Sequence, residues 1–161
     1  MFRVGLGKDT HRLVPGRRFL LGGVEIPFEK GEAGHSDGDV LIHAVIDALL
    51  GASGLGDIGE LFPSGDLKWK DADSRELLNA AWKMAQKEGW RIVNIDCVIV
   101  CENPKILPFR EKIRSSLAQI LEIDIPSVFA KGKTGEGLGP LGRGEAVEAL
   151  ALCLLVKDSP V

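Results

Sequence analysis

Three histidines occur in this 161-residue sequence, all within the first 43 positions. Asp9 and His11 are two residues apart, so on an extended strand their side chains leave the same face. His43 lies in a following segment whose apolar residues suit a buried helix. Two imidazoles and one carboxylate suit zinc and leave a fourth tetrahedral position free for water or substrate. The spacing therefore predicts a metal site that does chemistry or binds a ligand, with manganese and iron as alternatives on ligand type.

A purely structural interpretation of these residues stays open, because a carboxylate two residues before a histidine is a weak motif. In that case Asp9 caps a turn and both histidines are ordinary, partly buried side chains. Asp47, one turn after His43, is expected either to orient an imidazole or to be an exposed helix charge.

The segment 35–39, His-Ser-Asp-Gly-Asp, stands directly before that helix. Free backbone N–H groups and the helix dipole favour a phosphate there. His35 would add a side-chain donor to such a phosphate. One of the other polar residues is also expected to be the helix N-cap, and both roles are compatible.

A second candidate site is the glycine-rich loop over residues 132–144. It is not a Walker A loop, because the first glycine of that motif would fall on Ser127. Its backbone, its basic side chains and the Thr134 hydroxyl suit a phosphate. Glu136 would repel phosphates unless it holds a second cation such as Mg²⁺. The alternative is a solvated, flexible loop.

The composition favours one domain, spanning residues 1–161. A chain of this length with 45% hydrophobic residues can bury one core. Its net charge of −3 gives no overall basic field, so we expect no nucleic acid partner. No signal-peptide pattern or apolar run of about 18 residues occurs, so we expect no membrane partner. We expect a cytoplasmic protein with three reduced cysteines, or a plastid one in a plant-type source, although no transit peptide is recognisable.

The expected elements alternate irregularly along the chain. Strands are predicted at 2–8, 19–21, 24–26, about 90–101 and about 127–131, and helices at about 39–51, 73–88, 106–122 and 145–156. Asp39, His43 and Asp47 should share one polar stripe of the first helix. The pattern predicts an α+β (mixed α/β) fold, with a mixed sheet covered by helices on one face.

Several motifs together resemble the 2-C-methyl-D-erythritol 2,4-cyclodiphosphate synthase family of the non-mevalonate isoprenoid pathway. The likeness runs from about residue 2 to residue 156. The motifs are Gly5-x-Gly7-x-Asp9-x-His11, Gly22-Gly23-Val24, His35-Ser36-Asp37-Gly38-Asp39, Asp47-Ala48-Leu49-Leu50-Gly51, Gly56-Asp57-Ile58-Gly59, Leu61-Phe62-Pro63, Asp73-Ser74-Arg75-Glu76 and Gly142-Arg143-Gly144-Glu145.

The resemblance implies a homotrimeric phosphorus–oxygen lyase with active sites between subunits. The 2-phosphate of 4-diphosphocytidyl-2-C-methyl-D-erythritol 2-phosphate would attack the β-phosphorus of the same molecule. The cyclic diphosphate would form and CMP would leave. Isoprenoid diphosphates bind in the central channel of the family's trimer.

The resemblance also implies roles for individual residues. Asp9, His11 and His43 would hold zinc, and Glu136 would hold Mg²⁺ or Mn²⁺ on the diphosphate. His35 and Thr134 would orient phosphates and stabilise the transition state. The other substrate-binding positions are Ser36, Asp57, Gly59, Phe62, Ser64, Asp66, Cys101, Pro104, Lys105, Leu107, Lys133, Gly135, Pro140 and Arg143.

Within that set, Asp57 and Gly59 would contact diol or ribose hydroxyls, residues 62–66 would form a lid, and residues 101–107 would hold cytosine. Arg143 would line the channel. The chain departs from the family pattern at Lys133 and Gly135, where threonines are common, at Lys8 and Pro140, where aromatics are common, and at Ser64, where aspartate is frequent.

Two other functions use the same ligands. A metal-dependent phosphohydrolase would attack with a metal-bound water. A trimer that binds isoprenoid diphosphates without catalysis would use the metal only to hold its structure.

Overall fold

A mixed five-stranded sheet is the centre of the fold. The computed structural model describes residues 1–63, 65–69 and 71–158. The sheet order is β4-β1-β7-β5-β6, with β5 and β6 parallel and the other pairs antiparallel. Its strands are β1 (Phe2–Pro15), β4 (Lys30–Glu32), β5 (Arg91–Val100), β6 (Val128–Lys133) and β7 (Ala146–Val156). The expected hairpin of β2 (Phe19–Leu21) and β3 (Val24–Ile26) forms a separate two-stranded sheet.

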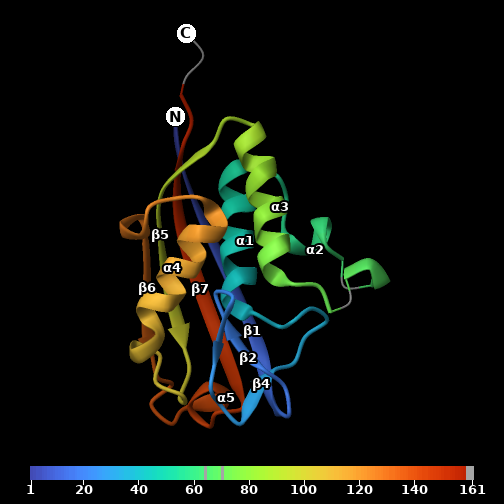
Figure 1. Ribbon diagram of the computed structural model, residues 1–161, viewed down its shortest axis with the longest axis vertical. Helices are drawn as coiled ribbons and strands as arrows, with labels where there is room; N and C mark the ends of the chain where they lie inside the picture. The colour runs from blue at the N-terminus through green and yellow to red at the C-terminus, as the bar shows by residue number, and fades with distance from the viewer. Residues whose placement is uncertain (64, 70, 159–161) are drawn as a thin grey trace.

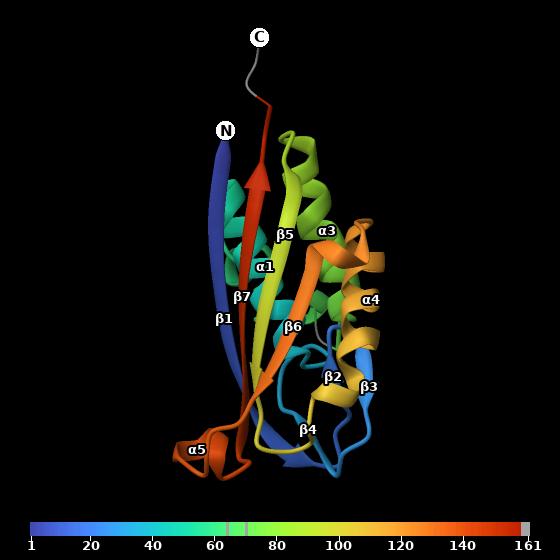
Figure 2. The same cartoon turned by 90° about the vertical axis from the view of Figure 1, so that its left-hand side faces the viewer.

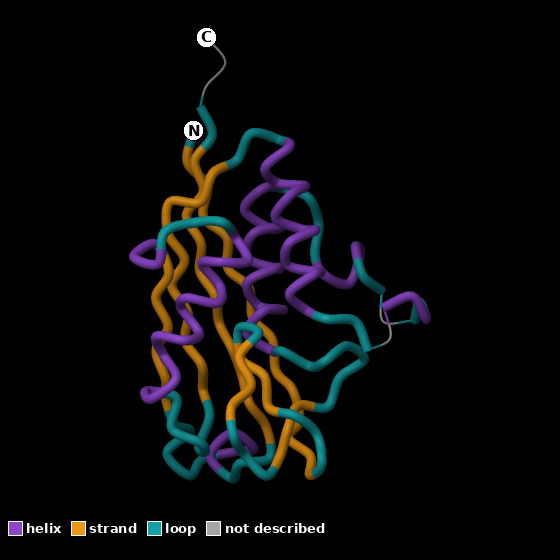
Figure 3. Tube along the Cα trace, in the orientation of Figure 1, coloured by secondary structure: helices purple, strands orange, loops and turns teal. Residues whose placement is uncertain are grey.

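Three long helices cover one face of the sheet (Figures 1 and 3). They are α1 (Val40–Ser53), α3 (Ser74–Lys87) and α4 (Arg110–Leu121). Shorter turns are α2 (Ile58–Leu61), α5 (Gly139–Gly142) and the 3₁₀ segments Leu67–Trp69, Leu107–Phe109 and Ile125–Ser127. The predicted fold class, a mixed sheet with helices on one face, is confirmed. Within the described ranges no helix is both long and apolar enough to span a membrane.

Helix α1 lies unusually close to strand β1. A Cβ atom built on Gly7 would stand 1.9 Å from the Ala44 carbonyl oxygen, so only glycine allows this approach. Gly5 meets the Ala48 carbonyl in the same way. Because strand side chains alternate between faces, Asp9 and His11 continue the row of Gly5 and Gly7. The close packing therefore brings both side chains to the N-terminal end of α1.

The prediction of a helix over 145–156 is wrong, because this segment is strand β7. It pairs with β1 on one side and β5 on the other. Its odd-numbered residues from Val147 to Leu155 are buried under the helices. A continuous apolar run does not distinguish a central strand from a buried helix, since both faces of such a strand are apolar.

Smaller differences concern the ends of elements. β1 extends to Pro15 rather than ending near residue 8, and β4 forms where we expected only a loop. Asp39 is not part of an exposed polar stripe; it is fully buried as the N-cap of α1 and accepts from the Ile42 N–H at 3.0 Å. α5 gives helical structure to part of the predicted flexible loop.

No helix of the described residues covers the second face of the sheet (Figure 2). Phe2, Val4 and Leu6 of β1 are 68%, 63% and 67% exposed on it. Leu6 pairs with Leu152 of β7, which is 42% exposed. Further along β1, Lys8 and Thr10 both contact Glu148 at 3.0 Å. This uncovered face is therefore apolar near the chain termini and charged toward the opposite end.

Candidate functional site

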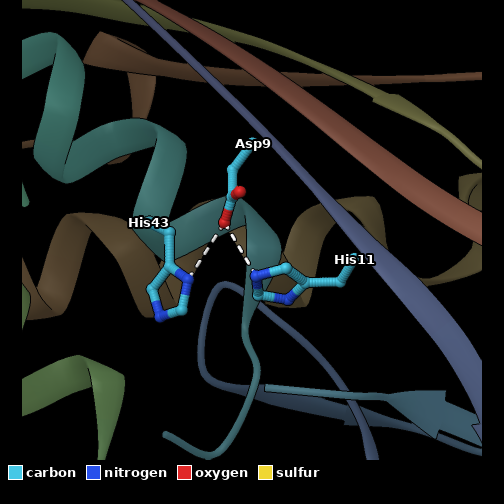
Figure 4. Close-up of side chains that lie close together, drawn as sticks. All are labelled: Asp9, His11 and His43. Atoms are coloured by element: carbon cyan, nitrogen blue, oxygen red, sulfur yellow. Dashed lines mark hydrogen bonds and ion pairs between the residues drawn. The ribbon is translucent and has the colours of Figure 1, made fainter. Parts of the chain in front are cut away.

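The three predicted metal ligands converge in one place (Figure 4). One carboxylate oxygen of Asp9, Oδ2, lies 2.9 Å from Nε2 of His11 and 3.0 Å from Nδ1 of His43. One ligand atom from each residue lies within 4.8 Å of the others. Strand β1 supplies two of these side chains and the first turn of α1 supplies the third. The sequence prediction that a strand and a helix bring them together is confirmed.

The remaining ring nitrogens fix how both imidazoles are oriented. Nδ1 of His11 donates to the Gly38 carbonyl at 2.6 Å. Nε2 of His43 lies 3.1 Å from the hydroxyl groups of both Ser36 and Ser74. Such outer contacts set the tautomer of a metal-bound histidine and leave the other nitrogen to the metal. The donor set and its outer contacts therefore fit a zinc ion with three protein ligands.

Mutual hydrogen bonding also changes the acidity of these groups. Burial disfavours the ionised form of Asp9, but hydrogen bonds with both histidines outweigh it and hold the Asp9 pKa below its ordinary value. Burial lowers the pKa of His11, yet the contact with Asp9 raises it overall. The cluster thus keeps a charged carboxylate, the form that binds a cation.

Asp47 does not orient His43. Its Oδ1 accepts from the Ile58 N–H at 2.8 Å, at the start of α2. The partners of His43 are instead the two serines, and Ser74 was missed in the sequence. Ser74 is the first residue of α3, and its own hydroxyl donates to Asp37 at 2.5 Å. Ser74 belongs to a motif typical of a helix start, and that motif predicts helix capping but no contact with a metal ligand.

The ligands open into a cavity of about 380 Å³, which we call the metal cavity. The predicted residues His35, Ser36, Gly59 and Phe62 line it. Sequence reasoning missed its other apolar wall residues, which are Ala33, Ile58, Trp69 and Leu77. The Trp69 ring meets the Phe62 ring edge to face at 5.0 Å. One end of the cavity therefore carries the three candidate metal ligands, and the other end is apolar.

Two other residues predicted for this site, Asp57 and Asp66, are not among those that line the cavity. Asp57 is the N-cap of α2 and accepts from the Glu60 N–H at 2.9 Å. Asp66 accepts from the Lys68 N–H at 2.9 Å and is not part of the cavity wall. Ser64 lies outside the described residues.

A second cavity of about 200 Å³ lies where β5 and β6 end, and we call it the cationic cavity. Five predicted residues line it, namely Cys101, Lys105, Leu107, Lys133 and Thr134. Ile106, Gly132 and Arg110 complete the wall. No acidic residue of the described chain lines this cavity, whereas three cationic residues do. Its chemistry suits an anionic ligand.

Other residues of the glycine-rich loop lie next to the cationic cavity. The Thr134 hydroxyl donates to Glu136 at 2.6 Å, and the Gly135 N–H donates to Glu102 at 3.0 Å. Pro104 and Arg143 line a neighbouring surface hollow instead. Pro140 is exposed in the first turn of α5.

Sheet register separates the two cavities within one chain. Asp9 pairs with Ala149, Ala149 with Ile99, and Ile99 with Gly132, so these residues form one row. Three strand spacings place Asp9 and Gly132 about 14 Å apart at the backbone. His35 and Thr134, expected to act together, belong to different cavities.

The fold and the site define a class of protein: an α+β domain with one cavity that carries three candidate metal ligands and one separate cationic cavity. The model of the YgbB family matches residues 2–156. The chain belongs to the YgbB family, which confirms the resemblance found in the sequence.

Relatives and solved structures agree with this assignment. A Treponema denticola protein named 2-C-methyl-D-erythritol 2,4-cyclodiphosphate synthase is 63% identical over 153 residues, 95% of each chain. A solved structure of another 2C-methyl-D-erythritol-2,4-cyclodiphosphate synthase, in a CDP-bound form, is 38% identical and has a TM-score of 0.88; the match covers 96% of this chain and 100% of that one. The bifunctional IspDF of Campylobacter jejuni is 40% identical with a TM-score of 0.95, and the match covers 99% of this chain but 43% of that protein.

Proposed function

We propose that this protein converts 4-diphosphocytidyl-2-C-methyl-D-erythritol 2-phosphate into 2-C-methyl-D-erythritol 2,4-cyclodiphosphate and CMP. An oxygen of the 2-phosphate forms a bond to the β-phosphorus while the bond from that phosphorus to the α-phosphate oxygen breaks. The enzyme is then a phosphorus–oxygen lyase. The observation that carries the proposal is the Asp9, His11 and His43 cluster, which opens into a cavity with both polar and apolar walls.

Residues around the metal cavity would hold and orient the phosphates. Asp9, His11 and His43 would bind zinc, which would supply Lewis-acid polarisation of a phosphate oxygen. His35 and Ser36, on the loop before α1, would donate hydrogen bonds to phosphate oxygens. The apolar wall formed by Ile58, Trp69 and Leu77 would receive the carbon skeleton and exclude water from the reacting groups.

Residues around the cationic cavity would bind the CMP part. The backbone of residues 101–107 would surround the base, and Lys133 would neutralise the leaving phosphate. Glu136 would hold Mg²⁺ or Mn²⁺ on the diphosphate, as one carboxylate combined with substrate phosphates suits these ions. Thr134 would then donate to a phosphate in place of its present bond to Glu136. No protein nucleophile is required.

We propose that the complete active site forms between subunits of a homotrimer. Two observations support this arrangement. Asp9 of the metal cavity and Gly132 of the cationic cavity lie about 14 Å apart at the backbone, on one row of a single sheet. The uncovered face of the sheet presents Phe2, Val4, Leu6 and Leu152 to solvent, and a contiguous apolar patch of this kind is typical of an interface. Three free, buried thiols fit a reducing compartment, so we place the trimer in the cytoplasm.

The reaction is tested by incubating purified protein with the cytidyl substrate, Zn²⁺ and Mg²⁺. CMP in equal amount with cyclic diphosphate supports the proposal, whereas linear phosphate products would indicate a phosphohydrolase.

The shared site is tested by mixing two inactive variants, His43→Ala and Thr134→Ala, after dissociation and reassembly. If each site uses one cavity from each of two subunits, random mixing makes about one quarter of the sites intact. Recovery toward a quarter of wild-type activity is expected. No recovery in a mixed trimer, verified by tagged subunits, would contradict sites shared between subunits.

A further inference from the structure

The cationic cavity contains an arginine whose hydrogen-bonding capacity the described protein does not use. Arg110, the first residue of α4, is part of the cavity wall. Its Nε atom is buried and has no hydrogen-bond partner among the described residues. Leaving a buried donor unpaired destabilises a folded protein, so this arrangement calls for an explanation.

Arg114, one turn further along the same helix, is an arginine whose hydrogen bonds are made within the protein. Its Nε donates to the Val128 carbonyl at 2.7 Å, and its Nη1 donates to Glu111 at 2.9 Å. Its Nη2 donates to the Ile125 carbonyl at 3.3 Å. The guanidinium groups of both arginines lie over the Phe129 ring, at 5.2 Å for Arg110 and 5.1 Å for Arg114. Arg114 therefore holds α4 against β6, while Arg110 shares only the aromatic contact.

The position of Arg110 in the helix does not explain why an arginine with an unpaired, buried Nε stands there. A positive charge in the first turn of a helix is opposed by the helix dipole. An acceptor on a bound ligand would satisfy the unpaired donor, and an anionic ligand would also offset this unfavourable charge interaction. Lys105 and Lys133 line the same cavity, so a ligand there meets three cationic residues.

We infer that Arg110 is a ligand-binding residue that donates hydrogen bonds to the pyrimidine nucleotide in the cationic cavity. This inference rests on the proposed function, which brings the CMP part of the substrate to this cavity. A planar guanidinium has five donors in a fixed fork, which match either phosphate oxygens or the adjacent O2 and N3 acceptors of cytosine. The shared chemistry is a pair of acceptors held in one plane.

The test measures binding of CMP and of cytidine to the metal-loaded wild-type protein and to three variants by calorimetry. Arg110→Gln removes the fork and the charge, Arg110→Lys keeps the charge, and Lys112→Gln removes an exposed charge from the same helix. Arg110→Gln should weaken CMP binding about tenfold or more, as loss of a hydrogen bond from a charged group predicts. Lys112→Gln should change the CMP affinity less than twofold. The loss of CMP affinity in Arg110→Lys should lie between those of the other two variants.

Cytidine identifies the acceptor. An equal loss for cytidine and CMP assigns Arg110 to the base, and a loss confined to CMP assigns it to the phosphate. Equal CMP affinity in wild type and Arg110→Gln, with unfolding temperatures also equal, would overturn the inference while leaving the proposed function intact. Wild-type protein that binds no CMP and releases none would overturn the proposed function itself.

Discussion

The metal cavity and the cationic cavity are built in different ways. The metal ligands come from the middle of β1 and the first turn of α1, and each imidazole is held by a second contact within the same chain. The cationic cavity is formed by residues that follow the ends of β5 and β6, with Lys105 and Leu107 exposed. The side chains of the first cavity are thus held by contacts within the chain, whereas two of the residues that line the second are exposed to solvent. A metal site needs ligands held in a fixed geometry, and only the first cavity has such supporting contacts.

The largest expected effect comes from removing a metal ligand. His43→Ala should abolish metal binding and reduce the rate of CMP release at least about 1,000-fold, the scale expected for loss of electrostatic stabilisation at a reacting group. Metal analysis and the CMP assay measure both quantities.

Asp47→Asn is the matched control, since Asp47 lies one turn further along α1 and contacts Ile58 rather than His43. It should keep its metal and most of its activity. A His43→Ala protein that loses its folded assembly, rather than only its activity, would show that the metal is structural.

The second prediction compares backbone packing near the two cavities. Gly7→Ala should destabilise the protein by about 3 kcal/mol or more, because the new Cβ would stand 1.9 Å from the Ala44 carbonyl and force β1 away from α1. Gly132→Ala meets the Ile106 side chain at 2.9 Å, which is also too close but involves a side chain. Gly132→Ala should therefore lower the free energy of unfolding clearly less than Gly7→Ala does. Denaturant unfolding measures both, and equal losses would refute the claim that the metal cavity is the more rigidly packed one.

The smallest expected effect concerns Glu32, at the end of β4. Glu32 is fully buried, and its Oε2 has no hydrogen-bond partner among the described residues. Burial, followed by repulsion from Asp39, raises its pKa well above the ordinary value. Because protonated Glu32 is favoured in the folded protein, its contribution to the free energy of unfolding is complete at pH values below the unfolded-state pKa. That contribution is lost as the pH rises through the folded-state pKa.

Glu32→Gln should consequently be more stable than wild type at pH 8, by at least about 1 kcal/mol, and similar to wild type near pH 4. Thermal unfolding from pH 4 to pH 9 measures the difference. A constant difference at all pH values would rule out ionisation of Glu32 as its cause.

The sequence was sufficient to predict the metal ligands because their geometry is local. Asp9 and His11 share a strand face by alternation, and His43 lies in the first turn of a helix that begins at Val40 and is capped by Asp39. Both features depend on neighbours in the chain, which a sequence displays directly. The close packing of strand on helix that Gly5 and Gly7 allow was not predicted.

Long-range pairing could not be predicted in the same way. The run from Ala146 to Val156 is a central strand because β1 and β5 pair with it, and nothing within the run indicates those partners. The row from Asp9 to Gly132 likewise depends on three registers. The contacts of Asp47 with Ile58, and of Ser74 with His43, depend on how α2 and α3 return to α1.

The row from Asp9 to Gly132 has a practical consequence for inhibition. Hydrogen-bond register in a folded sheet does not shift, so one chain cannot bring its own two cavities together. If the proposed trimer is correct, the concentration of complete active sites depends on the fraction of chains that are assembled. Dilution that dissociates the trimer should therefore reduce specific activity. A peptide that binds over Phe2, Val4 and Leu6 would then inhibit the enzyme by preventing subunit association, without competing with either the metal or the nucleotide.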